Sequence, residues 1–297
     1  MKDAVVSMPH ADSWRIVTDY IALTKPRLNM LVVATSAAGY YLGATSPVNA
    51  TVFLATVVGT AFVAGGAAAL NQVYERDTDA LMMRTRMRPL PSGRVSPADA
   101  RMFGVGLSIA GLALLAAFST WLASLLALAT LLIYLCVYTP LKRLSPAATI
   151  VGAVPGALPP LIGWVASHGT IAPGGLALFL IVFFWQIPHF MAIAWMYRDD
   201  YAAAGFPMLP VIDRDGPRAG RQAVGYAAAL LPASVVPTIV DLSGTAYGIV
   251  AAVLGIALLM LSIRFAGART NVAARHLFFA SIAYLPLIWI VMIADKR

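Results

Sequence analysis

Nine long apolar segments divide this chain, and they constrain its fold more than any other feature. They run over residues 28–45, 52–75, 102–119, 121–139, 149–166, 174–197, 223–241, 246–265 and 275–294. Each is close to the length of about 20 residues that a helix needs to cross the hydrocarbon core of a bilayer. Hydrophobic residues make up 60% of the chain and charged residues only 11%, a balance unlike that of soluble domains. We therefore predict an all-α polytopic membrane protein, with a cytoplasmic N-terminal arm (1–27) and a single transmembrane domain of nine helices (28–297).

The fifth apolar segment, 149–166, is the least regular of the nine. It contains Pro155, Pro159 and Pro160. Proline lacks the backbone N–H and its ring clashes with the preceding turn, so in a helix interior it kinks or breaks the helix. We therefore predict a kinked or broken helix at this place.

The basic residues are distributed very unevenly between the two sides of this topology. Nineteen of the 21 lysine and arginine residues lie on one side, and only Lys296 and Arg297 lie on the other. Basic residues accumulate in cytoplasmic loops, so we predict a cytoplasmic N-terminus and an external C-terminus in the inner membrane. This bias and attraction to anionic lipid explain the net charge of +8. The expected partner is therefore the lipid bilayer, and the charge is no indication of nucleic-acid binding.

A polar stripe follows directly on the second apolar segment. Asn71, Glu75 and Asp79 recur at every fourth residue, and Glu75 is the only glutamate in the chain. In a helix this spacing places side chains about 40° apart per step on one face. Acidic groups at the end of a membrane helix are costly unless they bind something, and carboxylate and amide oxygens suit Mg²⁺ together with substrate phosphates. The stripe therefore predicts a magnesium site.

A second acidic cluster, Asp199 and Asp200, follows the sixth apolar segment. Each acidic cluster is followed by a basic loop that contains proline and glycine, at residues 84–94 and 205–221. The offset of four helices suits a ring whose halves face each other across a cavity. Two acidic clusters that meet at a basic rim predict a diphosphate site, because carboxylates hold Mg²⁺ while Arg or Lys neutralises the remaining phosphate charge.

Other polar residues have simpler interpretations. Asp77 points away from the stripe, and we expect it to pair with Arg76 or Arg84. Cys136 is the only cysteine and the four histidines are scattered, which excludes an intrachain disulfide and the known zinc motifs.

Several short passages carry a family resemblance that extends from Leu23 to the last apolar segment. They are Leu23–Arg27, Asn71–Asp79, Met83–Thr85, Arg88–Leu90, Tyr138–Arg143, Gly156–Trp164, Trp185–His189, Tyr201 and Pro207–Pro210. Together they resemble the UbiA superfamily of intramembrane prenyltransferases. The resemblance implies nine transmembrane helices around a central cavity, with acidic motifs on the second and sixth helices.

Within the superfamily, these passages are most similar to the branch that farnesylates haem. The resemblance implies transfer of a farnesyl group from farnesyl diphosphate to a vinyl group of protohaem IX, with addition of water. The products would be haem O, for a terminal oxidase, and diphosphate. The implied cofactor is Mg²⁺, and a terminal oxidase or a haem A synthase would be a protein partner.

The resemblance also implies the roles of individual residues. Catalysis and metal binding are expected of Asn71, Glu75, Asp79 and Asp200. Substrate binding is expected of Lys25, Arg27, Arg84, Arg88, Tyr138, Lys142, Arg143, His189, Asp199 and Tyr201. His189 is expected to contact haem, with packing as its alternative role.

The chain departs from the superfamily pattern at two places. Glu75 stands where the superfamily usually has Asp, and Asp199–Asp200 are adjacent rather than four residues apart.

Two alternative functions remain. One alternative is a prenyltransferase that acts on an aromatic or quinone-precursor acceptor. The other is a transporter whose intramembrane acids line an ion path. Against the transporter, the acids cluster at one membrane face.

Overall fold

The computed structural model describes residues 13–45 and 47–297, so the first twelve residues of the expected N-terminal arm lie outside the described part. The long helices are α2 (Pro26–Gly43), α3 (Ala50–Tyr74), α5 (Pro97–Phe118), α8 (Ala148–His168), α9 (Pro173–Met196), α12 (Pro217–Ile239), α13 (Thr245–Ala268) and α14 (Asn271–Ala294). A further long rod consists of α6 (Trp121–Leu132), the π-helix η1 (Ile133–Tyr138) and α7 (Thr139–Leu141). The short helices are α1 (Ser13–Leu23), α4 (Arg76–Leu81), α10 (Arg198–Ala203) and α11 (Leu209–Ile212).

The helices confirm the all-α prediction, and each of the nine apolar segments forms a helix at its predicted place. Among the described residues, eight helices are long and apolar enough to span a membrane. The other segment, 28–45, lies in α2, which has 18 residues and carries Arg27 and Asn29 at its start. This helix packs along α3 and α8 and so belongs to the same bundle.

Side-chain caps define where several of these helices begin. The Asn49 side chain accepts hydrogen bonds from the N–H groups of Thr51 and Val52 at the start of α3. Ser96 caps α5, Thr120 caps α6 and Thr270 caps α14 in a similar way. Such caps satisfy N–H groups that have no partner inside the helix.

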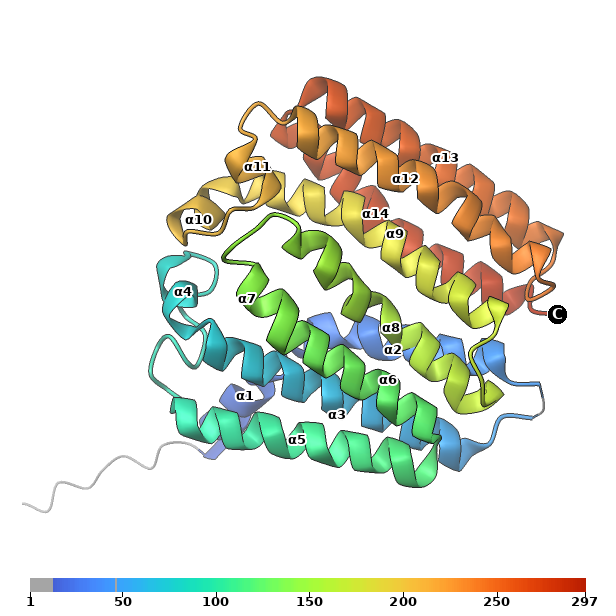
Figure 1. Cartoon of the computed structure of the whole chain (residues 1–297), viewed down its shortest axis with the longest axis horizontal. Coiled ribbons are helices and arrows are strands. Elements are labelled where there is room, and N and C mark those ends of the chain that lie inside the picture. The colour runs from blue at the N-terminus through green and yellow to red at the C-terminus, as the bar shows by residue number, and fades with distance from the viewer. Residues whose placement is uncertain (1–12, 46) are drawn as a thin grey trace, which may run out of the picture.

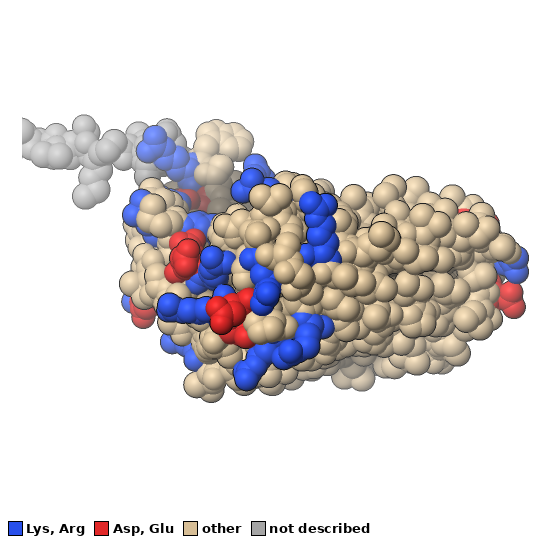
Figure 2. Space-filling view, turned by 90° about the horizontal axis from the view of Figure 1, so that it is seen from above, with Lys and Arg blue, Asp and Glu red and all other residues tan. Residues whose placement is uncertain are grey.

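The long helices lie side by side, with α5 at one edge of the view and α13 at the other (Figure 1). The short helices α4, α10 and α11 lie together at one end of the bundle, and the C-terminus lies at the opposite end (Figure 1). Figure 2 shows lysine and arginine gathered at the end that carries these short helices, and a broad uncharged band behind them. Polar chemistry is therefore concentrated at one end of an apolar bundle.

Helices α2 and α8 approach each other unusually closely because glycine is present at their contacts. A β-carbon at Gly163 would collide with the carbonyl oxygen of Ser36, and one at Gly39 would collide with that of Pro160. Small residues allow the backbones of membrane helices to pack in direct contact. This contact fixes α2, and with it the segment that precedes it, against the centre of the bundle.

Of the kink or break predicted for the fifth helix, the break is wrong. Helix α8 runs without interruption from Ala148 to His168 and contains Pro155, Pro159 and Pro160 in its interior. The Gln186 side chain of α9 packs against this stretch of α8 and donates a hydrogen bond to the carbonyl oxygen of Ala153. Prolines are tolerated in membrane helices because neighbouring helices and small local adjustments accommodate them.

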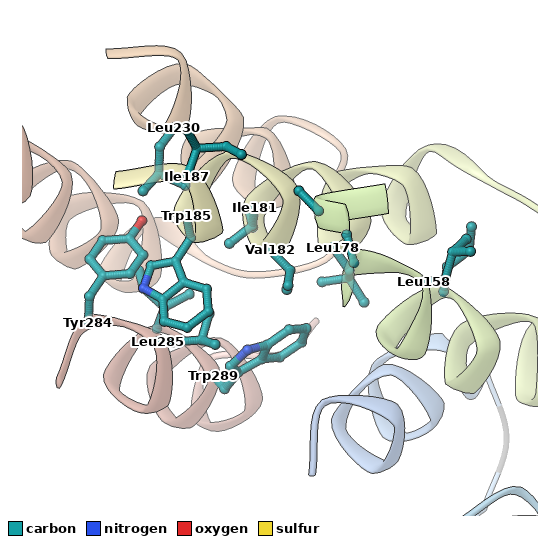
Figure 3. Packing of buried hydrophobic residues seen from close by; sticks show 14 of the residues in the cluster. Leu158, Leu178, Ile181, Val182, Trp185, Ile187, Leu230, Tyr284, Leu285 and Trp289 are labelled. Atoms are coloured by element: carbon teal, nitrogen blue, oxygen red, sulfur yellow. The ribbon is translucent and has the colours of Figure 1, made fainter. Parts of the chain in front are cut away.

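The apolar core includes the contacts of α9 with α12 and α14. Figure 3 shows Trp185 of α9 directed toward α14, near Tyr284, Leu285 and Trp289. The Trp185 indole N–H donates to the carbonyl oxygen of Ser281 at 2.7 Å. This core holds α9 firmly against α14 and so fixes the position of the acidic cluster at the end of α9.

Candidate active site

The acidic stripe lies at the junction of α3 and α4. Helix α3 ends at Tyr74, and Glu75 separates it from α4 with φ −96° and ψ 9°. The helical hydrogen-bond pattern nevertheless continues, from the Glu75 N–H to the Asn71 carbonyl at 2.9 Å and from the Asp79 N–H to the Glu75 carbonyl at 2.8 Å. The three side chains therefore lie on the same side of the α3–α4 segment. Asn71, Glu75 and Asp79 are only 2%, 4% and 1% exposed.

Among the described residues, three basic side chains from three segments reach this stripe. Lys25 Nζ lies 3.2 Å from Asn71 Oδ1. Lys142 Nζ lies 3.2 and 3.4 Å from the two carboxylate oxygens of Glu75. Arg88 donates to Asp79 Oδ2 at 2.7 Å. Buried charges are stable only when they are paired, and here two carboxylates face three basic groups, which leaves an excess of positive charge.

The surroundings perturb the two lysines in opposite directions. Burial and the charge of Arg88 lower the pKa of Lys25 to about 8, although Glu75 and Asp79 act to raise it. Burial acts to lower the pKa of Lys142, but Tyr138 and Glu75 outweigh it and hold that pKa above its usual value. Lys142 is therefore a fixed positive charge beside Glu75.

Lys25 reaches the site because of its unusual backbone. It lies between α1 and α2 and adopts the left-handed conformation, with φ 49° and ψ 57°. The Gln72 side chain donates to the carbonyl oxygen of Leu23 at 2.7 Å and ties the end of α1 to α3. The N-terminal arm thus contributes a side chain to the site.

A π-helical turn positions a hydroxyl group beside Asn71. The Thr139 hydroxyl donates to the Tyr134 carbonyl oxygen at 2.8 Å and lies 3.2 Å from Asn71 Nδ2. The rings of Tyr134 and Tyr138 in the same turn stack at 5.4 Å. Short π-helical turns within α-helices are frequent at functional sites. The amide N–H₂ of Asn71 donates to Thr139, so its oxygen is directed to the other side, toward Lys25.

The second acidic cluster lies at the same end of the bundle, in the first turn of α10 (Figure 1). Asp199 is exposed and Asp200 is half-buried, while Tyr201 is buried against Phe206. The Phe206 ring also lies 4.4 Å from Lys142 Nζ, and so links this cluster to the first one. Within the described residues, however, no group of three His, Cys, Asp or Glu side chains is close enough together to hold a metal ion.

The remaining predicted residues have varied surroundings. Arg84 lies over the Tyr197 ring at 5.4 Å, and the exposed Arg143 lies 3.5 Å from the Thr78 hydroxyl. Arg27 is exposed at the start of α2. His189 is half-buried, and its Nδ1 lies 2.8 Å from the Ser281 hydroxyl.

The prediction for Asp77 is confirmed. Its carboxylate lies 2.9 Å from the Arg76 guanidinium, and its side chain is 82% exposed. Asp77 therefore belongs to the surface, outside the buried stripe.

The sequence interpretation did not single out Thr139, Phe206 or Ser281. Thr139 lies inside the Tyr138–Arg143 passage that carries the family resemblance, and this position could have marked it. Its contact with Asn71 could not be predicted, because the two residues are 68 positions apart in the sequence. Nothing local marks Phe206 or Ser281, because each acts through a neighbour on another helix.

A separate pocket of about 770 Å³ lies at the opposite end of the bundle. Its lining includes Trp164, His168, Lys296 and Arg297. Lys296 donates to the carbonyl oxygens of Tyr41 and Ala44 at the end of α2. These contacts give Lys296 a structural role, and the pocket contains none of the residues of the acidic stripe.

Known proteins resemble this chain over nearly its full length. The model of the UbiA prenyltransferase family matches residues 32–284. The protoheme IX farnesyltransferase of Opitutus terrae is 48% identical over 280 residues, which cover 94% of this chain and 95% of that protein. The protoheme IX farnesyltransferase of Solibacter usitatus is 45% identical over 287 residues, with 94% and 98% covered.

Solved structures share the fold at lower identity. The structure of a digeranylgeranylglyceryl phosphate synthase superposes with a TM-score of 0.80 at 18% identity and covers 94% of this chain and 98% of that one. A UbiA homologue from Archaeoglobus fulgidus, bound to DMAPP and Mg²⁺, gives a TM-score of 0.67 at 18% identity, with 93% and 99% covered.

Proposed function

The chain belongs to the UbiA prenyltransferase family, with protoheme IX farnesyltransferases among its full-length relatives, and from this premise we propose that it synthesises haem O. In this reaction the allylic C–O bond of farnesyl diphosphate breaks and diphosphate leaves. A C–C bond forms to a vinyl group of protohaem IX, and water adds to the other vinyl carbon with loss of a proton. The enzyme is thus a prenyltransferase of the membrane.

One observation at the level of residues supports this proposal. It is the buried stripe of Asn71, Glu75 and Asp79, surrounded by Lys25, Arg88 and Lys142 at the polar end of the bundle. Such a combination suits a substrate that brings both phosphate oxygens and a divalent cation. The excess positive charge of the site complements an anionic diphosphate.

The donor atoms of the stripe fit Mg²⁺, which prefers hard oxygen ligands and shares them with substrate phosphates. Asn71, Glu75 and Asp79 would hold the ion, with Asp200 as a further ligand from α10. When bound, Mg²⁺ would neutralise part of the charge on the departing diphosphate. The carboxylates in this structure are paired with Lys142 and Arg88, so ligation would require these basic groups to turn to the phosphate oxygens.

The basic side chains of the site would act directly on the leaving group. Lys25, Arg88 and Lys142 would stabilise the charge that develops on the diphosphate as the allylic bond breaks. The stacked rings of Tyr134 and Tyr138 lie beside the stripe and would stabilise an allylic cation. The apolar bundle would keep water from the cation until the C–C bond has formed.

The other predicted residues take outer positions in this proposal. Substrate binding is assigned to Arg27, Arg84, Arg143, Tyr138, His189, Asp199 and Tyr201. Arg84 and Arg143 belong to the loops beside the stripe and would attract the diphosphate, whereas Asp199 and Tyr201 would position the α10 segment.

The charge distribution supports a specific membrane placement. On the face shown in Figure 2, lysine and arginine gather at the end that carries α4, α10 and α11, where the stripe also lies. We infer that this end faces the cytoplasm of a cell with the protein in its inner membrane. The product would pass to a terminal oxidase or to a haem A synthase.

Pigment analysis tests the reaction. Membranes that contain the chain, supplied with haem, farnesyl diphosphate and Mg²⁺, are expected to form hydroxyethylfarnesyl haem, identified by chromatography and mass. Asp79→Asn should lower the rate by about 100-fold or more, because it removes a carboxylate that would hold the Mg²⁺ ion beside the departing diphosphate. Asp77→Asn is the matched control and should retain full activity. Chelation of Mg²⁺ should stop the reaction and its return should restore it.

Two results would contradict the proposal. No haem O from well-folded protein would exclude haem as the acceptor, and prenylation of a phenolic compound would identify the acceptor instead. Equal activity of the Asp77→Asn and Asp79→Asn variants would exclude the stripe as the site.

A further inference from the structure

His189 occupies an aromatic sandwich between α9 and α14. Its ring stacks on Trp185 with a centroid distance of 5.0 Å and on Phe278 at 5.1 Å, with interplanar angles of 19° and 22°. Trp185 and His189 are four residues apart and therefore lie on the same face of α9. Both faces of the imidazole are covered, so only its edges are available to a ligand.

The hydrogen bonds around Ser281 determine which ring nitrogen carries the proton. The Ser281 hydroxyl donates to the Phe278 carbonyl oxygen at 2.6 Å, and a carbonyl oxygen can only accept. A hydroxyl has a single proton, so toward His189 Nδ1, at 2.8 Å, Ser281 acts as the acceptor. Nδ1 therefore carries the hydrogen, and Nε2 has a free lone pair.

The Nε2 edge has no hydrogen-bond partner among residues 13–45 and 47–297. The ring is nevertheless half-buried rather than buried, although both of its faces are stacked and Nδ1 is bonded. Nε2 is not among the buried polar atoms without a partner, so it is accessible. Histidines that ligate metals almost always hold their other ring N–H in a hydrogen bond, as Nδ1 is held here, so this ring meets that requirement.

The depth of His189 suits a haem that reacts at the polar end. His189 precedes the end of α9 at Met196 by seven residues, or about 10 Å along a helix. The acidic clusters lie just beyond that end.

From this geometry we propose that His189 Nε2 is an axial ligand of the protohaem iron and that Ser281 is a positioning residue that fixes the ligating tautomer. The inference rests on the proposed function, because it concerns the acceptor substrate of that reaction. The ligation changes no oxidation state and only replaces a solvent ligand on the iron. It would hold the acceptor in place while the vinyl group reacts.

Haem binding to the purified full-length protein in nanodiscs tests this ligation without turnover. Ferrous haem on the wild-type protein is expected to show an iron–histidine stretching band by resonance Raman spectroscopy. His189→Ala should lose this band and bind haem at least about tenfold more weakly, and added imidazole should restore a nitrogen-ligated spectrum. His276→Ala is the matched control, since His276 is exposed on α14 and should leave both readouts unchanged.

Ser281 provides a second test that does not remove the ligand. Ser281→Ala should weaken haem binding by about 10- to 100-fold, as is typical when the partner of a ligating histidine is lost, whereas Ser281→Thr keeps the hydroxyl and should bind normally. Metal-free protoporphyrin IX should bind equally to the wild type and to both His189→Ala and Ser281→Ala.

The outcomes separate this inference from the proposed function. An unchanged band and affinity in His189→Ala, with haem O still formed by the wild type, would overturn the ligation and leave the reaction intact. Equal losses for haem and protoporphyrin in His189→Ala would also overturn it, because they indicate packing and not ligation. Failure of the wild type to form haem O would refute the proposed function itself.

Discussion

At the scale of single residues, the site depends on which basic groups are buried with the acids. Lys25 and Arg27 are two residues apart, and the sequence gives them similar expected roles. In the structure Lys25 contacts Asn71, whereas Arg27 is exposed at the start of α2. The two positions therefore form a natural pair for comparison.

We expect Lys25→Met to raise the KM for farnesyl diphosphate by about tenfold or more, because a hydrogen bond from a charged group to the substrate is lost. Arg27→Met should leave the KM close to that of the wild type. Initial rates measured over a range of farnesyl diphosphate concentrations, at fixed haem and Mg²⁺, give the comparison. Equal effects of the two substitutions would show that Lys25 acts only through general positive charge.

A second prediction concerns the amide of Asn71. Thr139→Val removes the hydroxyl that accepts from Asn71 Nδ2 and leaves a buried donor unpaired, which costs about 1–3 kcal/mol. We expect lower activity and weaker binding of Mg²⁺, which raises the Mg²⁺ concentration needed for half-maximal rate. The reason is that the amide oxygen is no longer held in one direction. Thr139→Ser should behave like the wild type. A Mg²⁺ titration of the rate, with identical half-saturation in all three proteins, would refute this role.

At the scale of secondary-structure elements, the junction of α2 with α8 is a close helix contact that positions part of the site. It holds α2, and Lys25 immediately before it, against the bundle. Its tightness depends on glycine, since a side chain at Gly163 would meet the Ser36 carbonyl.

We therefore expect Gly163→Ala to destabilise the protein by about 1–3 kcal/mol through overpacking. Gly106 on α5 is the control, because a β-carbon there would meet no other atom within 4 Å. Gly106→Ala should stabilise α5 by up to about 1 kcal/mol through its higher helix propensity. Thermal unfolding in detergent gives the stability of both variants. A lower unfolding temperature for Gly106→Ala than for Gly163→Ala would contradict the packing argument.

At the scale of the whole molecule, charge is segregated along the axis of the bundle. Basic residues surround the acidic stripe at one end, an uncharged band follows, and a few charges lie at the other end (Figure 2). Such a distribution both orients a membrane protein and concentrates anions at the site.

This segregation predicts the topology. A phosphatase that is active only outside the cytoplasm should be active when fused after Arg297 and inactive when fused in the loop between α5 and the acidic stripe. A fluorescent protein that folds only in the cytoplasm should give the opposite pattern. The reverse result would place the diphosphate site outside the cell and contradict the proposed orientation.

The sequence by itself was sufficient for the helices and for the common side of the acidic stripe. Apolar segments of about 20 residues leave few alternatives to membrane helices, because backbone groups must be satisfied within each segment in lipid. The spacing of Asn71, Glu75 and Asp79 likewise predicted one common side, since helical periodicity is a local property. The same local reasoning did not anticipate that α8 continues without a break through three prolines.

Only the tertiary structure decided which partners these residues meet. Lys25 and Lys142 are 46 and 67 residues away from Asn71 and Glu75, yet they contact them. The contact of His189 with Ser281 spans 92 residues. Such pairings depend on how the helices pack, and each helix face admits several neighbours of similar apolar character. Side-chain volume, close glycine contacts and buried hydrogen bonds select one arrangement, and these become visible only when all the helices are in place.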